Sequence, residues 1–223
     1  MKHWWKVLII VLMPMLLYMA WMNPVSTQTI LHETIRNLYF HVTMWLSMFV
    51  LFTISLVNSV LYLRKDDIKY DIRATMSVQV GMVYGTIGIF TGMVWANNTW
   101  GAPWVNDPQL NSAAITMVAY LAYLILHASI TGEQKKGRVA AVYNIFAFVL
   151  MFILLGIYPR LNESLHPGKG DNPGFGNYKD ISKTMKYIFY GSVLMWTLIG
   201  VWIYMTKCRM KRIENALKEK SST

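Results

Sequence analysis

The chain has 223 residues, of which 55% are hydrophobic and only 14% are charged, and its formal net charge is +10. Ordinary soluble domains carry roughly 25% charged residues. The apolar residues gather into runs of about 20, the length that crosses ~30 Å of hydrocarbon. This composition excludes a soluble enzyme and a disordered chain. The single cysteine, Cys208, excludes a disulfide-stapled secreted domain, a dithiol oxidoreductase and a covalent c-type haem carrier.

Six apolar segments predict an all-α integral membrane protein with six transmembrane helices, folded as a single domain over residues 1–223. The segments must be helical, because an open strand in lipid would leave its backbone polar groups unsatisfied. The expected spans are residues 4–22, 38–63, 76–95, 110–130, 139–158 and 185–205. The first span also fits a signal peptide, since Lys2 and Lys6 precede its apolar run, although no small-x-small cleavage site is evident.

The distribution of Lys and Arg predicts how these spans are oriented. The connections on one side of the spans, together with both termini, hold fifteen of the 21 Lys and Arg residues. The connections on the other side hold six. The positive-inside rule therefore places the N and C termini in the cytoplasm. Three loops, residues 23–37, 96–109 and 159–184, then lie on the outer side. Because the basic residues flank apolar segments, we expect them to contact the lipid bilayer and not nucleic acid.

Two features inside the spans indicate packing. Glycines at positions 81, 85, 88 and 92 of the third span give that helix a flat face, which allows close approach to a neighbouring helix. His127, near the inner end of the fourth span, is expected to be a hydrogen-bonded packing residue.

The outer loop at residues 96–109 concentrates tryptophan, proline and glycine. Trp100 and Trp104 could wall a flat apolar ligand, and Gly101 would let the backbone approach it. Two plainer interpretations remain open. In the first, the tryptophans form an interfacial aromatic belt. In the second, Asp107 and Pro108 start the fourth helix as its N-cap and first residue.

Three of the five histidines, His32, His41 and His166, are predicted on the outer side. His41 opens the second span one helical turn before Trp45, so both side chains share a face. His166 lies in the Pro/Gly-rich loop between the last two spans. Two neutral imidazoles approaching from opposite sides are what a six-coordinate haem iron requires, so His41 and His166 are the candidate metal ligands.

Three segments resemble the tryptophan-rich haem-handling superfamily and, by size and span number, its small CcmC family. In the loop, the residues that agree in register with the family signature are Trp100, Gly101, Trp104, Val105, Asp107, Leu110 and Ser112. The family's Tyr-x-His-Val motif is similar to residues 39–42, and its Leu-His pair is similar to Leu165 and His166. Four positions depart from the family: Asn106 stands for a tryptophan, Pro103 for an aromatic residue, Gln109 for an arginine and Pro167 for a glutamine.

The resemblance implies a multi-pass protein of the bacterial inner membrane that acts in cytochrome c biogenesis. Such a protein binds haem b at its periplasmic face through two histidines, here His41 and His166, and delivers it to the haem chaperone CcmE. Its other implied partners are a small membrane protein and an ATP-dependent release complex. Trp45, Trp100, Gly101, Trp104 and Asp107 are then expected to border or position the haem.

One basic residue is a candidate for the haem propionates. Arg36, a turn before His41, could pair with a propionate and compensate for the arginine missing at position 109.

Three other functions fit the sequence less well. A membrane-anchor haem b electron-transfer subunit needs histidines at matching depth on neighbouring spans, and only His127 is securely within one. A haem lyase, the enzymatic alternative, belongs to superfamily members that are generally much larger, so we expect haem binding and transfer without catalysis. A solute transporter would need ionisable residues or broken helices inside the bilayer, and the spans have almost none.

Overall fold

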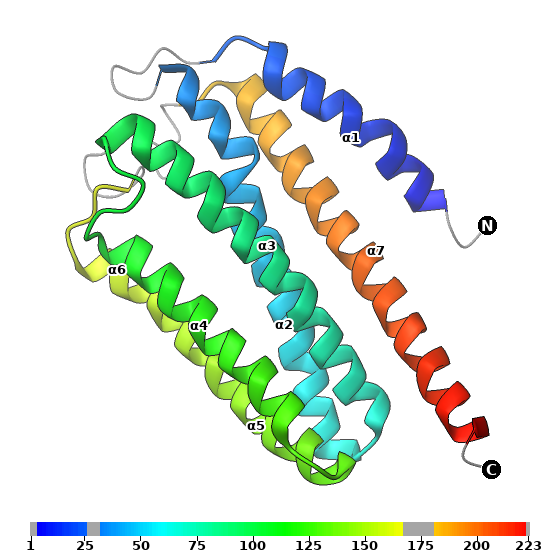
Figure 1. Ribbon diagram of the computed structural model, residues 1–223. Helices are drawn as coiled ribbons and strands as arrows, with labels where there is room; N and C mark the ends of the chain where they lie inside the picture. Colours follow the sequence, from blue (N-terminus) through cyan, green and yellow to red (C-terminus); the bar gives the residue numbers. More distant parts are fainter. Residues whose placement is uncertain (1–3, 26–31, 167–180, 222–223) are drawn as a thin grey trace.

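The computed structural model describes residues 4–25, 32–166 and 181–221, and all regular structure within them is helical (Figure 1). The elements are α1 (Trp4–Met22), the 3₁₀ helix η1 (His32–Tyr39), α2 (His41–Lys65), α3 (Ile68–Trp100), α4 (Pro108–Ser129), α5 (Glu133–Met151), the π-helical segment η2 (Phe152–Ile157), α6 (Tyr158–Leu161) and α7 (Lys183–Ser221). Six helical stretches are long and apolar enough to cross a membrane, as the sequence predicted. Pro167 and most of the expected loop 159–184 lie outside the described residues.

The first helix has the expected bounds, residues 4–22, whereas two others extend well beyond the apolar segments that predicted them. The third begins at Ile68 instead of residue 76 and ends at Trp100 instead of 95, and the last continues to Ser221 instead of ending at 205. Hydropathy marks only the apolar part of a helix, whereas the backbone hydrogen-bond ladder continues through polar turns until a capping residue ends it. The expected loop 96–109 therefore shrinks to residues 101–107, because the first five of its residues are helical.

Capping residues explain the ends of α3. The side chain of Asp67 accepts a hydrogen bond from the backbone N–H of Lys69 at 3.0 Å and so caps the first turn. At the other end Gly101 has a φ of +78°, in the left-handed region where glycine is favoured because it lacks a Cβ. Gly101 thus turns the chain sharply out of the helix and into the tryptophan loop.

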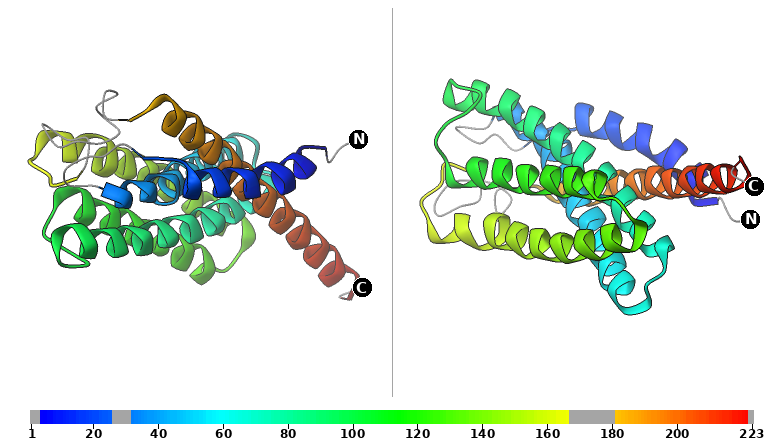
Figure 2. Two further views of the ribbon diagram at one scale, coloured as in Figure 1. Left: turned by 90° about the horizontal axis from the view of Figure 1, so that it is seen from above. Right: turned by 60° about the horizontal axis from the view of Figure 1, so that its bottom comes forward.

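The helices pack in the spatial order α1, α7, the α2–α3 hairpin and the α4–α5 hairpin (Figures 1 and 2). α2 is central and packs against α3, α5 and α7. α4 packs against α3 and α5 and meets α2 through the stacked rings of Phe52 and Tyr120, whose centroids are 3.7 Å apart. Residues of both α2 and α4 line the cavity described below.

The glycine face of α3 packs against α2, as predicted. A Cβ built on Gly81 would lie 2.4 Å from the ring of Phe52, and one on Gly85 would lie 2.7 Å from the sulfur of Met48. Real Cβ atoms do not approach other atoms so closely, so a larger residue at Gly81 would displace the Phe52 ring, and one at Gly85 would displace Met48 and Met117. The absence of side chains on this face sets the distance between α2 and α3.

Polar contacts tie the helices together at the end opposite the tryptophan loop. The carboxylate of Asp66, in the α2–α3 turn, accepts hydrogen bonds from Gln134 at 2.6 Å and Arg138 at 3.1 Å, both on α5. Those two donors hold the pKa of Asp66 below its usual value. Nearby, Nε2 of His127 lies 3.0 and 3.1 Å from the two carboxylate oxygens of Asp71 on α3. His127 is therefore a hydrogen-bonded packing residue, as expected.

Candidate functional site

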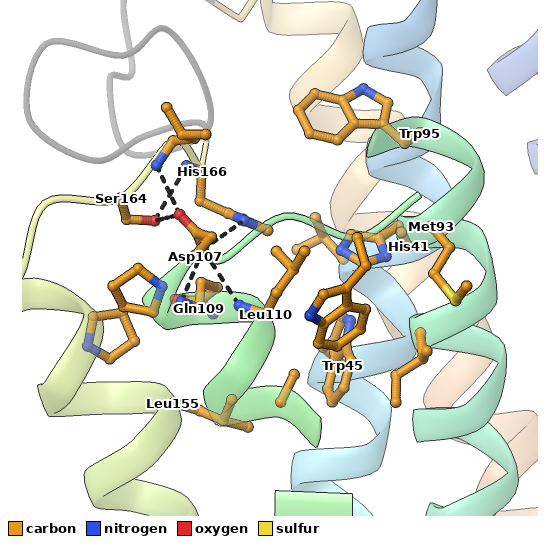
Figure 3. Close-up of a pocket in the computed structure, with 18 of the residues that line it drawn as sticks. His41, Trp45, Met93, Trp95, Asp107, Gln109, Leu110, Leu155, Ser164 and His166 are labelled. Atoms are coloured by element: carbon orange, nitrogen blue, oxygen red, sulfur yellow. Dashed lines mark hydrogen bonds and ion pairs between the residues drawn. The ribbon is translucent and has the colours of Figure 1, made fainter. Parts of the chain in front are cut away.

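A cavity of about 1340 Å³ occupies the end of the bundle where α3 stops and α4 starts (Figure 3). Its walls are the first turns of α2, the last turns of α3, the tryptophan loop, the start of α4 and residues 159–166. Pockets for small molecules usually measure about 300–1,000 Å³. This cavity is therefore large enough for a large flat ligand, with space left for solvent. Of the candidate site residues from the sequence, six line it: His41, Trp45, Trp100, Trp104, Asp107 and His166.

His41 is held rigidly against α3. Its Nδ1 atom lies 2.8 Å from the carbonyl oxygen of Gly88 and 3.3 Å from the hydroxyl of Thr91. A carbonyl only accepts hydrogen bonds, so Nδ1 carries the proton and Nε2 presents a lone pair. A Cβ on Gly92 would lie 2.7 Å from the imidazole of His41, so the glycine face extends to this site. This is the usual arrangement of a ligating histidine, oriented through its other ring nitrogen.

Asp107 connects the two chain segments that form the opposite wall. Oδ1 accepts hydrogen bonds from the backbone N–H groups of Gln109 at 2.8 Å and Leu110 at 3.3 Å, which caps α4. Oδ2 accepts hydrogen bonds from the hydroxyl of Ser164 and the backbone N–H of Leu165, both at 2.8 Å. The Asp107 residue is only 1% exposed. One buried carboxylate therefore fixes both the start of α4 and the segment that carries His166.

His166 faces His41 across the cavity, and Figure 3 shows the two imidazoles entering it from opposite walls. Their ring centroids are 6.3 Å apart. A metal–imidazole bond is about 2 Å long and the ring centre lies about 1 Å behind the nitrogen, so two imidazoles on one metal have centroids about 6 Å apart. The observed separation suits a metal held between the two rings. Nδ1 of His166 also lies 3.8 Å from Oδ1 of Asp107, so the ring sits beside the buried carboxylate.

Aromatic rings surround the two histidines. Trp45 meets His41 edge to face with a centroid distance of 6.3 Å. Trp100 lies 5.8 Å from the His166 ring and 5.0 Å from Trp95, both in edge contacts. A Cβ on Gly88 would lie 2.9 Å from the indole of Trp45, so that indole too depends on the glycine face. The walls are thus apolar and aromatic around the two imidazoles.

Two candidate residues are placed differently from the others. Gly101 does not line the cavity, and nothing lies within 4 Å of a Cβ built on it, so the left-handed turn is its structural role. Arg36 on η1 also lies outside the cavity lining. Its guanidinium donates hydrogen bonds to the carbonyls of Ala20 and Asn23, both at 2.8 Å, and pairs with Glu33 at 2.6 Å. Arg36 therefore ties η1 to the end of α1.

Three residues of the site were missed from the sequence. Thr91 and Ser164 hold the two histidine segments, and Arg160 lines the cavity. The only available signal for Ser164 was its position two residues before His166, where its hydroxyl accepts the backbone N–H of His166 at 3.2 Å. Nothing in the sequence marked Arg160 as a site residue, because basic residues are common at the ends of membrane spans.

Comparison with known proteins gives one family match. The model of the family described as "Cytochrome C assembly protein" matches residues 2–166, well over half of the chain, and the match ends at His166. "Heme exporter protein C" of Rhodobacter capsulatus is 26% identical over 162 residues, which are 72% of this chain and 65% of that protein.

Shorter matches join the chain to a second group of relatives. "Cytochrome c biogenesis protein CcsA" of Thermosynechococcus vestitus is 37% identical over 89 residues, 40% of this chain and 27% of that protein. The protein of the same name from Arabidopsis thaliana is 35% identical over 86 residues, 36% of this chain and 25% of that protein. The chain thus matches less than two thirds of the length of these relatives.

Proposed function

The chain belongs to the cytochrome c assembly protein family, and from that premise we propose that it binds haem b in the cavity and delivers it to the periplasmic haem chaperone CcmE. His41 and His166 ligate the iron from opposite sides. The observation that carries the proposal is the 6.3 Å separation of their rings inside an aromatic cavity. The relative named as a haem exporter supports the choice of ligand.

Haem suits this cavity for simple chemical reasons. It is a flat apolar ring with a charged propionate edge, so it needs an aromatic wall, nitrogen ligands for iron and an opening to water. Trp45, Trp100 and Trp104 supply the wall, and Trp104, which is 37% exposed, stands at the opening. Haem is cargo here, so the cavity must hold it without trapping it.

The two ligands differ in how firmly they are held, which gives a route for release. His41 is at the first turn of a long helix and is fixed by Gly88. His166 lies beyond the last turn of α6, and its segment is fixed mainly through Asp107. When the chaperone approaches, His166 is the ligand that can withdraw at lower cost. In this step haem leaves His166, and no covalent bond forms between haem and this chain. The proposed activity is therefore haem binding and transfer without catalysis by this chain.

The charge distribution supports the proposed orientation. The α2–α3 and α4–α5 connections lie at the end opposite the cavity, and the basic residues within or beside them are Arg64, Lys65, Lys69, Arg73, Lys135, Lys136 and Arg138. The positive-inside rule places that end in the cytoplasm and the cavity at the periplasmic face of a bacterial inner membrane. A small membrane partner and an ATP-dependent release complex complete the proposed system.

A haem-transfer assay tests this function against electron transfer. The full chain is purified in detergent, loaded with haem and mixed with tagged CcmE, and the haem that co-purifies with the tag is measured. We expect transfer from the wild type and altered transfer from the His166→Ala variant. Haem that remains on the wild-type chain while undergoing reversible reduction would support the electron-transfer subunit instead.

A further inference from the structure

The cavity contains an uneven set of charged side chains. Among the described residues that line it, Arg160 is the only lysine or arginine. The two lining carboxylates are Asp107, which is fully engaged in hydrogen bonds, and Glu163. A ligand with its own carboxylates therefore has one arginine to meet in this part of the molecule.

Local structure holds Arg160 beside the cavity. It lies on α6, which follows the π-helical segment η2 and has Pro159 in its first turn. The guanidinium donates one hydrogen bond, from Nη1 to the carbonyl oxygen of Gly156. A guanidinium has five N–H donors in a fixed planar array, and no carboxylate of the described residues pairs with this one within salt-bridge distance. Among the described residues its other donors have no carboxylate partner and can meet an anion in the cavity.

A second observation concerns the facing wall. Gln109, which occupies the position of the arginine in the family signature, also lines the cavity from the start of α4. Its Oε1 atom is buried and has no hydrogen-bond partner in the described part of the chain. α4 and α6 are in contact, so the segments carrying Gln109 and Arg160 are neighbours. The positive charge absent from α4 is thus supplied to the same cavity by α6.

We propose that Arg160 binds a propionate carboxylate of the haem and so fixes which edge of the porphyrin faces α6. The inference rests on the proposed function, since it needs haem as the ligand. Arginine suits this role because its planar donors match the two oxygens of a carboxylate. Arg160 is a specificity residue: it distinguishes a porphyrin with free carboxylates from one without them, while the histidines hold the iron.

Haem dimethyl ester provides a direct test, because esterification removes the propionate charges and leaves the iron and ring unchanged. The full chain in detergent is titrated with ferric haem and with the ester, and binding is followed by Soret absorbance. We expect the wild type to bind the free acid roughly three- to tenfold more tightly than the ester, the range of a partly exposed charge pair. The Arg160→Gln variant should bind both equally, with the Soret maximum of the wild type.

Two further variants complete the design. Arg160→Lys keeps the charge but not the planar donors, so it should retain part of the preference and keep the test valid if the glutamine variant is unstable. Arg64→Gln removes one charge from the exposed end of α2, far from the cavity, and should leave the preference unchanged.

Two outcomes separate the possible failures. If Arg160→Gln still prefers the free acid by the wild-type factor, the inference about Arg160 is overturned while the histidine site stands. If the wild type gives a histidine-ligated spectrum with neither porphyrin, the proposed function is overturned, and the role of Arg160 with it.

Discussion

Nδ1 of His41 donates a hydrogen bond to the carbonyl oxygen of Gly88, at 2.8 Å. This contact connects the first residue of α2 with the glycine face of α3, so the packing of two helices also orients a candidate iron ligand. The carbonyl fixes the tautomer, so Nε2 is the ring nitrogen that presents a lone pair. The packing of α2 against α3 therefore also sets the position of the His41 imidazole.

Replacing Gly92 by alanine should disturb the ligand. The new Cβ would lie 2.7 Å from the His41 ring, and overpacking of this kind costs about 1–3 kcal/mol. We expect a lower unfolding temperature and a changed Soret spectrum. Gly81→Ala is the matched control, because its Cβ would meet Phe52, away from the cavity. The Gly81→Ala variant should lower stability and leave the spectrum unchanged. Equal spectral effects in both variants would contradict a specific effect of Gly92 on His41.

Replacing Asp107 by alanine should loosen the wall that carries His166. The variant loses the α4 cap and the bonds to Ser164 and Leu165, and we expect a cost of about 2–4 kcal/mol. Haem dissociation should accelerate, because His166 loses its orientation. Ser164→Ala removes one of these bonds and should produce a smaller change in the same direction. The rate of haem dissociation is measured by stopped-flow absorbance. An unchanged rate in Asp107→Ala would contradict the role of Asp107 in positioning His166.

The buried pair of Asp71 and His127 should contribute to stability without affecting haem. Asp71 is 5% exposed and both its oxygens lie within 3.1 Å of His127 Nε2. Asp71→Asn weakens a charge-assisted contact, so we expect the free energy of unfolding to fall by about 1–3 kcal/mol, measured by thermal or denaturant unfolding. The Soret spectrum should remain that of the wild type. A shifted Soret maximum would show that this end of the bundle is coupled to the cavity.

Acid should weaken the contact between the α2–α3 turn and α5. Hydrogen bonds from Gln134 and Arg138 lower the pKa of Asp66 from 3.8. Because the pKa of Asp66 is lower in the folded than in the unfolded chain, its hydrogen bonds stabilise the fold fully at pH values above the unfolded pKa of about 4. This stabilisation is lost as the pH falls from there through the folded pKa. Asp66→Asn should therefore unfold at a lower temperature than the wild type at pH 7. The difference should shrink near pH 3, and a constant difference would contradict this assignment.

The sequence predicted the number of spans and the glycine packing face, because each depends on a local pattern that the fold preserves. His41 and His166 line one cavity, and their role as iron ligands stays a prediction. The sequence could not predict that α3 continues to Trp100, since the helix end is set by the left-handed turn at Gly101 and not by hydropathy. The sequence also could not predict which parts of the fold Arg36 and Arg160 contact. Whether an arginine faces the cavity or the end of α1 depends on tertiary packing between segments far apart in the chain.

The central claim is that His41 and His166 hold one iron between them, and an absorption spectrum of the haem-loaded protein tests it most directly. We predict a low-spin, bis-histidine spectrum for the wild type and loss or alteration of the Soret band in both His41→Ala and His166→Ala. His127→Ala, which removes a histidine outside the cavity, is the matched control and should keep the wild-type spectrum. A wild-type Soret band in both cavity variants would contradict the assignment of these ligands.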